Sequence, residues 1–106
     1  MNKKKVLIKE VLESRKNLEK YDLTKIKGIA MECFNSLKAF IDKITNIEEE
    51  KEEIKIVEEQ LILLNKYINL YNLANSTHKS EKTLQKIKNC ILMCKNTIDN
   101  ELLKIA

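Results

Sequence analysis

The chain has 106 residues, of which 43% are hydrophobic and 34% charged, with a formal net charge of +4, no proline and one glycine. Residues 1–106 are therefore expected to form a single domain that can bury a core without a disulfide or a metal, and the composition is typical of long helices. Three cysteines, one histidine and no glycine-rich phosphate loop argue against disulfide-stabilised, zinc-binding and nucleotide-hydrolysing proteins.

The first predicted helix covers about residues 3–20. Apolar residues recur there at steps of three and four, the spacing of one helix face, at Leu7, Val11, Leu18 and Tyr21, with Ser14 at one position of that face. The break after this helix has two interpretations. Asp22 or Thr24 could cap a second helix, whereas Gly28 could end a longer first one. We expect the break near Asp22, because the next apolar series runs through Gly28 without a change of phase.

Three more helices are predicted, at about residues 23–45, 47–74 and 79–104. Thr45 with Glu48 has the pattern of a capping box at the start of the third helix, and Ser80 is a candidate cap for the fourth. Each helix carries one continuous apolar series: from Leu23 through Ile26, Ala30, Cys33, Leu37, Phe40 and Ile44 to Ile47; Ile54, Val57, Leu61, Leu64, Ile68 and Tyr71; and Leu84, Ile87, Ile91, Cys94 and Ile98, then Leu102 and Ile105. Short connections make consecutive helices antiparallel neighbours. We predict an all-α, antiparallel up-and-down four-helix bundle, with a three-helix bundle containing one longer helix as the alternative.

The third helix carries a second apolar stripe beside its main series. The stripe comprises Ile56, Leu63, Tyr67, Leu70 and Ala74, with Gln60 at the missing step, and lies about 100° around the helix from the first. Two interpretations remain open. The bundle could bury both stripes, or the second could bind a partner helix or a second copy of the chain. For the second case, Ile56, Leu63, Tyr67 and Leu70 are the candidate partner-binding residues.

Cys90 and Cys94 lie four residues apart in the segment NCILMC and raise the question of a metal or redox site. Cys94 and Cys33 fall within core series, where a cysteine behaves as a small apolar residue. A structural zinc site would need all three cysteines and His78 to converge, and the two side chains of one helix do not meet in a disulfide. We therefore expect three free thiols and no metal or other cofactor.

Catalytic patterns are weak throughout the chain. His78 falls in a polar loop and lacks the neighbours expected of a phosphorelay histidine or a di-iron ligand. Glu49 with Glu52, and Glu50 with Glu53, have the spacing of magnesium ligands in all-α pyrophosphatases, but the matching Glu-x-x-Asp, Glu19 with Asp22, comes before them. Acidic residues in a first helical turn usually stabilise that helix end. A magnesium-dependent, pyrophosphatase-like enzyme is only the third hypothesis, and we expect no catalytic residue.

Charge is distributed unevenly along the chain. Residues 1–20 carry seven basic and three acidic side chains, residues 46–75 carry three and seven, and residues 76–106 carry six and three. Such a bipolar surface favours a partner with complementary patches. Nucleic-acid binding through the basic first and fourth helices is the second hypothesis, but nineteen of the twenty basic residues are lysines, which lack the bidentate contacts of arginine. Lysine, asparagine and isoleucine are also what an AT-rich genome favours.

The leading hypothesis is a non-enzymatic protein-binding module that occludes or holds another protein. The amino terminus begins with lysines, as a signal peptide does, but Lys9 and Glu10 interrupt its apolar part, and no apolar run could span a membrane. We expect a cytoplasmic protein. Its length, four-helix pattern and basic start are those of small bacterial bundles such as export chaperones, bacteriocin immunity proteins and phage-encoded inhibitors, without the diagnostic residues of any of them.

Overall fold

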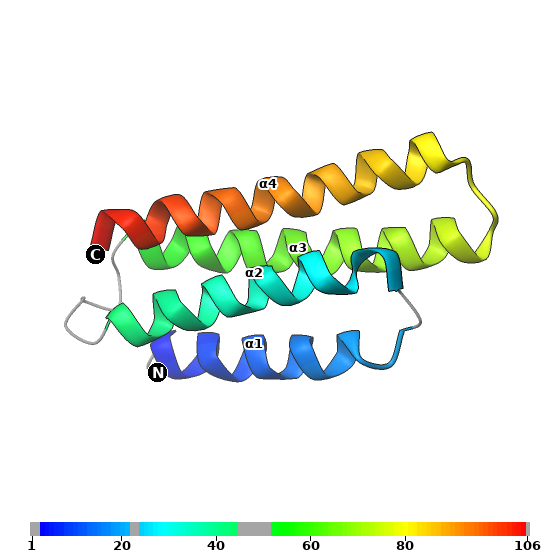
Figure 1. Ribbon diagram of the computed structural model, residues 1–106. Coiled ribbons are helices and arrows are strands. Elements are labelled where there is room, and N and C mark those ends of the chain that lie inside the picture. The colour runs from blue at the N-terminus through cyan, green and yellow to red at the C-terminus, as the bar shows by residue number, and fades with distance from the viewer. Residues whose placement is uncertain (1–2, 22–23, 45–51, 106) are drawn as a thin grey trace.

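The computed structural model describes residues 3–21, 24–44 and 52–105, and it forms a bundle of four helices (Figure 1). These are α1 (Lys3–Leu18), α2 (Thr24–Lys43), α3 (Glu52–Ser76) and α4 (Glu81–Ile105). They run alternately up and down, so that α1 begins at the end of the bundle where α4 finishes (Figure 1). The predicted all-α four-helix bundle is confirmed. None of these helices is long and apolar enough to cross a lipid bilayer.

The helix boundaries agree with the capping signals that the structure describes. Helix α1 ends at Leu18 and α2 continues through Gly28, which confirms the break before Thr24. At the start of α4, the Thr83 amide donates to Ser80 Oγ at 3.3 Å, as expected of an N-cap. The predicted capping box at Thr45 and Glu48 lies outside the described residues.

Helix α3 ends in a Schellman motif that the sequence did not reveal. The Lys79 amide donates to the Ala74 carbonyl at 2.9 Å and the His78 amide to the Asn75 carbonyl at 3.2 Å. His78 has a φ of 56°, the left-handed conformation that this motif requires. Its exposed side chain agrees with the expected loop position.

The helices do not pack in chain order around the bundle. Helix α4 packs chiefly against α3 and α2, while α1 packs against α2 and, less closely, α3. Helices α2 and α3 contact each other only slightly, so they lie across a diagonal although they follow one another in the chain. The outer sides of α3 and α4 therefore form one broad face with no further helix of the described chain over it. We call it the α3/α4 face.

The core contains most of the three predicted series. Every described member of the α2 and α3 series is at most 3% exposed, and in α4 Ile91, Cys94 and Ile98 are equally buried. Ile87, Leu102 and Ile105 of the α4 series are only partly buried, and Leu23 and Ile47 lie outside the described residues. Phe34 and Ile41 are also buried, because α2 contacts both α1 and α4 and needs a wider apolar face than one series supplies.

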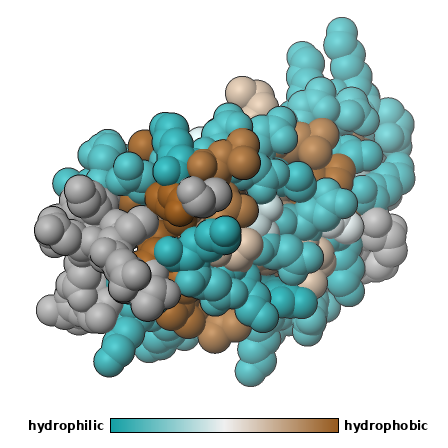
Figure 2. Space-filling model, turned by 60° about the vertical axis from the view of Figure 1, so that its left-hand side comes forward, coloured by the Kyte–Doolittle hydropathy of each residue, from teal (hydrophilic) through white to brown (hydrophobic). Residues whose placement is uncertain are grey.

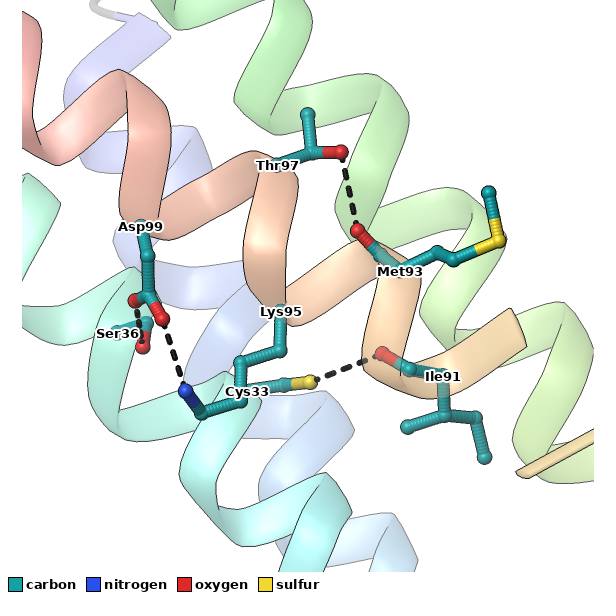
Figure 3. Close-up of polar contacts among 7 residues, drawn as sticks. All are labelled: Cys33, Ser36, Ile91, Met93, Lys95, Thr97 and Asp99. Atoms are coloured by element: carbon teal, nitrogen blue, oxygen red, sulfur yellow. Dashed lines mark hydrogen bonds and ion pairs between the residues drawn. The ribbon is translucent and has the colours of Figure 1, made fainter. Parts of the chain in front are cut away.

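Partly buried polar side chains of the described residues join the helices beside the core. Ser14, which interrupts the α1 series, accepts a hydrogen bond from Asn65 of α3 at 2.9 Å. Between α2 and α4, the Ser36 hydroxyl and the Lys95 ammonium donate to the two carboxylate oxygens of Asp99, at 2.5 and 2.8 Å (Figure 3). Burial alone would raise the pKa of Asp99, but these hydrogen bonds and the Lys95 charge lower it below the ordinary 3.8. The Asp99 carboxylate therefore remains ionised and helps to align α4 on α2.

Candidate protein-binding face

The second stripe of α3 lies on the α3/α4 face, between the core and the solvent. Ile56, Leu63 and Tyr67 are partly buried, and Leu70 is 40% exposed. Ala74, at the end of the stripe, is buried. By contrast Leu64, one residue from Leu63, has no exposed surface. The bundle therefore buries the main series completely and the second stripe only in part.

A groove of about 300 Å³ follows this stripe between α3 and α4. Leu63, Tyr67 and Gln60 line it from α3, and Cys90, Met93, Cys94 and Thr97 line it from α4. Met93 is 67% exposed, so one wall carries a flexible apolar side chain that can adapt to a contacting surface. The Met93 side chain points away from Cys33 and Ser36, which are residues of α2 (Figure 3).

Polar atoms beside the groove are largely satisfied within the bundle. The Thr97 hydroxyl donates to the Met93 carbonyl at 3.0 Å, inside α4 itself (Figure 3). Burial raises the pKa of the Tyr67 hydroxyl, and interactions with the thiols of Cys90 and Cys94 raise it further. Tyr67 therefore stays neutral near pH 7 and presents an apolar ring with a polar edge, the kind of side chain that protein interfaces favour.

The three cysteines are free thiols, and they differ in surroundings. Burial raises the pKa of Cys33 to about 12 and that of Cys94 to about 11, with smaller effects of neighbouring groups. The Cys33 thiol also donates to the Ile91 carbonyl at 3.5 Å (Figure 3). Both residues have the core positions expected from the sequence, whereas Cys90 is only partly buried and lines the groove. Of the two cysteines of α4, Cys94 therefore has a core thiol and Cys90 a surface thiol.

The described acidic, histidine and cysteine side chains lie too far apart to form a metal site. In residues 3–21, 24–44 and 52–105, no group of three or more histidine, cysteine, aspartate or glutamate side chains is placed to hold a metal ion. Glu52 is exposed, and its predicted magnesium partner Glu49 lies outside the described residues, as do Glu50 and Asp22. The magnesium hypothesis therefore gains no support from the described side chains.

Glu101 is a buried acidic residue that sequence reasoning missed. It is 4% exposed, its Oε1 accepts a hydrogen bond from Lys104 at 2.9 Å, and its Oε2 has no partner among the described residues. Its position could have been found, because a step of three from Ile98 leads to Glu101, whereas the predicted series continued by a step of four to Leu102. Leu102 is only partly buried.

Other apolar surface is present but is less suited to a partner. Figure 2 shows apolar side chains between hydrophilic ones at the end of the bundle where α1 begins and α4 finishes. A second groove, of about 210 Å³, lies between α1 and α2, and its apolar wall is broken by Arg15, Lys38 and Asp42. Within the part of the chain that the structure describes, the α3/α4 face combines a groove with a stripe that runs along most of a long helix.

Comparison with known proteins identifies no relative: no protein-family model, curated protein or solved structure matches the chain. Its function therefore has to be inferred from the geometry of the bundle and of the α3/α4 face.

Proposed function

We propose that the protein is a non-enzymatic binding module that occludes or holds another protein through its α3/α4 face. The observation that carries the proposal is the partial exposure of the second α3 stripe beside a groove lined by Met93 and Tyr67. A stripe needed only for folding would be buried like Leu64. An apolar surface retained on two long, well-packed helices is what a partner helix or loop requires.

The character of the face favours a protein partner over a substrate. Its apolar residues lie along two helices rather than around a closed cavity, and a tyrosine and a methionine stand at its centre. An inhibitor, an immunity protein or a chaperone would act in this way, by covering a surface of its target. Three free thiols suit the reducing cytoplasm, where we place the protein.

Nucleic acid is a weaker candidate on the same geometry. Lys25, Lys95 and Lys104 each form an ion pair with a carboxylate of the protein, at 2.8 to 2.9 Å, which reduces the positive charge offered to phosphates. The remaining lysines give few simultaneous contacts, and such binding weakens steeply with salt.

The test is capture from the native host, compared between the wild type and three surface variants. Tyr67→Ala and Met93→Ser alter the proposed face, and Leu12→Ser alters an equally apolar, 61% exposed site on α1. We expect one protein captured by the wild type to bind the purified Leu12→Ser variant normally and the two face variants at least about tenfold more weakly. Equal affinities for all four proteins would contradict the proposal.

A further inference from the structure

We propose that the α3/α4 face binds a second copy of this chain in an antiparallel, two-fold symmetric dimer. The inference rests on the proposed function because both use the same face. It adds that a second copy of the chain occupies this face when no partner is bound. The reason lies in the distribution of charge at the two ends of the face, with the apolar groove between them.

One end of the face is acidic. Glu52 and Glu59 follow the spacing of Ile56 and Leu63, which places them on the same side of α3. Both are exposed, and neither forms an ion pair with another described residue. This end of α3 therefore presents two exposed carboxylates beside the stripe, with the exposed Lys55 between them in the helix.

The other end of the face is basic. Lys82 and Lys86 precede Cys90 and Met93 at the same spacing, so they lie on the outer side of α4. They too are exposed and unpaired among the described residues. Helices α3 and α4 are antiparallel, so the start of α4 lies beside the end of α3, far from Glu52 (Figure 1).

Apolar side chains occupy the middle of the face. The groove brings Leu63 and Tyr67 of α3 opposite Met93 of α4. Measured from there at 1.5 Å per residue, Glu59 lies about 9 Å towards one end and Lys86 about 10.5 Å towards the other. The acidic and basic positions are therefore nearly equidistant from the centre.

A two-fold axis that lies in the interface and crosses the helices at this centre exchanges the two ends. It packs α3 on α3 and α4 on α4 of the second copy, with the two apolar centres together. Glu52 and Glu59 of one copy then lie at the same end of the dimer as Lys86 and Lys82 of the other, diagonally across neighbouring helices. A parallel arrangement would instead bring like charges to the same end. The face is then complementary to itself, as an isologous interface requires, because every contact between the two copies occurs twice.

Self-association would also serve the proposed binding function. A partner protein that uses the same face has to displace the second copy. The dimer would thus keep the apolar stripe covered until the partner binds.

Charge reversal on the surface provides the test, since the four residues are exposed and their replacement leaves the core intact. One variant carries Glu52→Lys with Glu59→Lys, and the other carries Lys82→Glu with Lys86→Glu. In sedimentation velocity at about 100 μM and low salt, we expect the wild type at twice its mass of 12.4 kDa and each variant alone as a monomer. An equimolar mixture of the two variants should form a heterodimer, because one face is then basic throughout and the other acidic.

Two outcomes would overturn the inference. A monomeric wild type shows that the face does not bind a second copy, while host capture with Tyr67→Ala still decides the proposed function. A dimer that persists in both charge-reversed variants and in Tyr67→Ala shows that the chain associates through another surface.

Discussion

The two apolar stripes of α3 have similar residues, the same spacing and different surroundings. Leu61, Leu64 and Ile68 are at most 3% exposed, while Leu63 and Tyr67 are partly buried and Leu70 is 40% exposed. The difference arises from the order of the helices around the bundle, in which α3 packs closely against α4, less closely against α1, and lies across the diagonal from α2. An apolar stripe is thus part of the core only where another helix packs over it.

Replacing the two adjacent leucines tests this contrast most strongly. Leu64→Ser should lower the free energy of unfolding by about 3 kcal/mol or more, because it leaves a cavity and a buried hydroxyl in the core. Leu63→Ser should lower it by about 1 kcal/mol, since part of that side chain already contacts solvent. Urea unfolding of both variants measures the difference. Equal losses would show that the second stripe belongs to the core and remove the proposed binding face.

The cysteines of α4 extend the contrast to the neighbouring helix. Because burial raises the pKa of Cys94 to about 11 and that of Cys33 to about 12, few of these thiols are ionised at pH 8. Cys90, beside the groove, should react with a thiol reagent at least about tenfold faster than either. Time-resolved titration of the folded protein should show one fast and two slow thiols, and Cys90→Ser should remove the fast phase. Three equal rates would mean that Cys94 and Cys33 are not enclosed.

The smallest expected effect concerns the side of α4 that faces α2. Asp99→Asn should lower the free energy of unfolding by about 1 kcal/mol at pH 7, because the charged acceptor of Ser36 and Lys95 is lost. The pKa of Asp99 is lowered in the folded protein, so its stabilisation is present above the ordinary pKa of 3.8 and is lost as the pH falls towards the folded-state value.

Denaturant unfolding between about pH 7 and pH 3 checks this sign. The gap between the wild type and Asp99→Asn should shrink as the solution becomes more acidic, and Ser36→Ala provides a control that keeps the carboxylate. Binding through the α3/α4 face should be unaffected by either change. A gap that widens at low pH would contradict the assigned role of Asp99.

The sequence by itself determined the local features of this protein. Helical periodicity identified the four helices and the main buried series, including the core positions of Cys33 and Cys94, because the side-chain pattern along a helix depends only on its own residues. The Ser80 cap and the break before Thr24 were equally local. Glu101 shows the limit of this reasoning, since the predicted series continued from Ile98 to Leu102 and passed over the acidic residue that the structure buries.

Only the tertiary structure decided which apolar residues remain at the surface. The near absence of contact between α2 and α3, the burial of Phe34 and Ile41 and the pairing of Ser14 with Asn65 all depend on which helices become neighbours. That choice follows from packing among segments far apart in the chain, which the periodicity of one helix cannot encode. For the same reason, the second stripe of α3 could be found in the sequence, but its partial exposure beside Met93 could not.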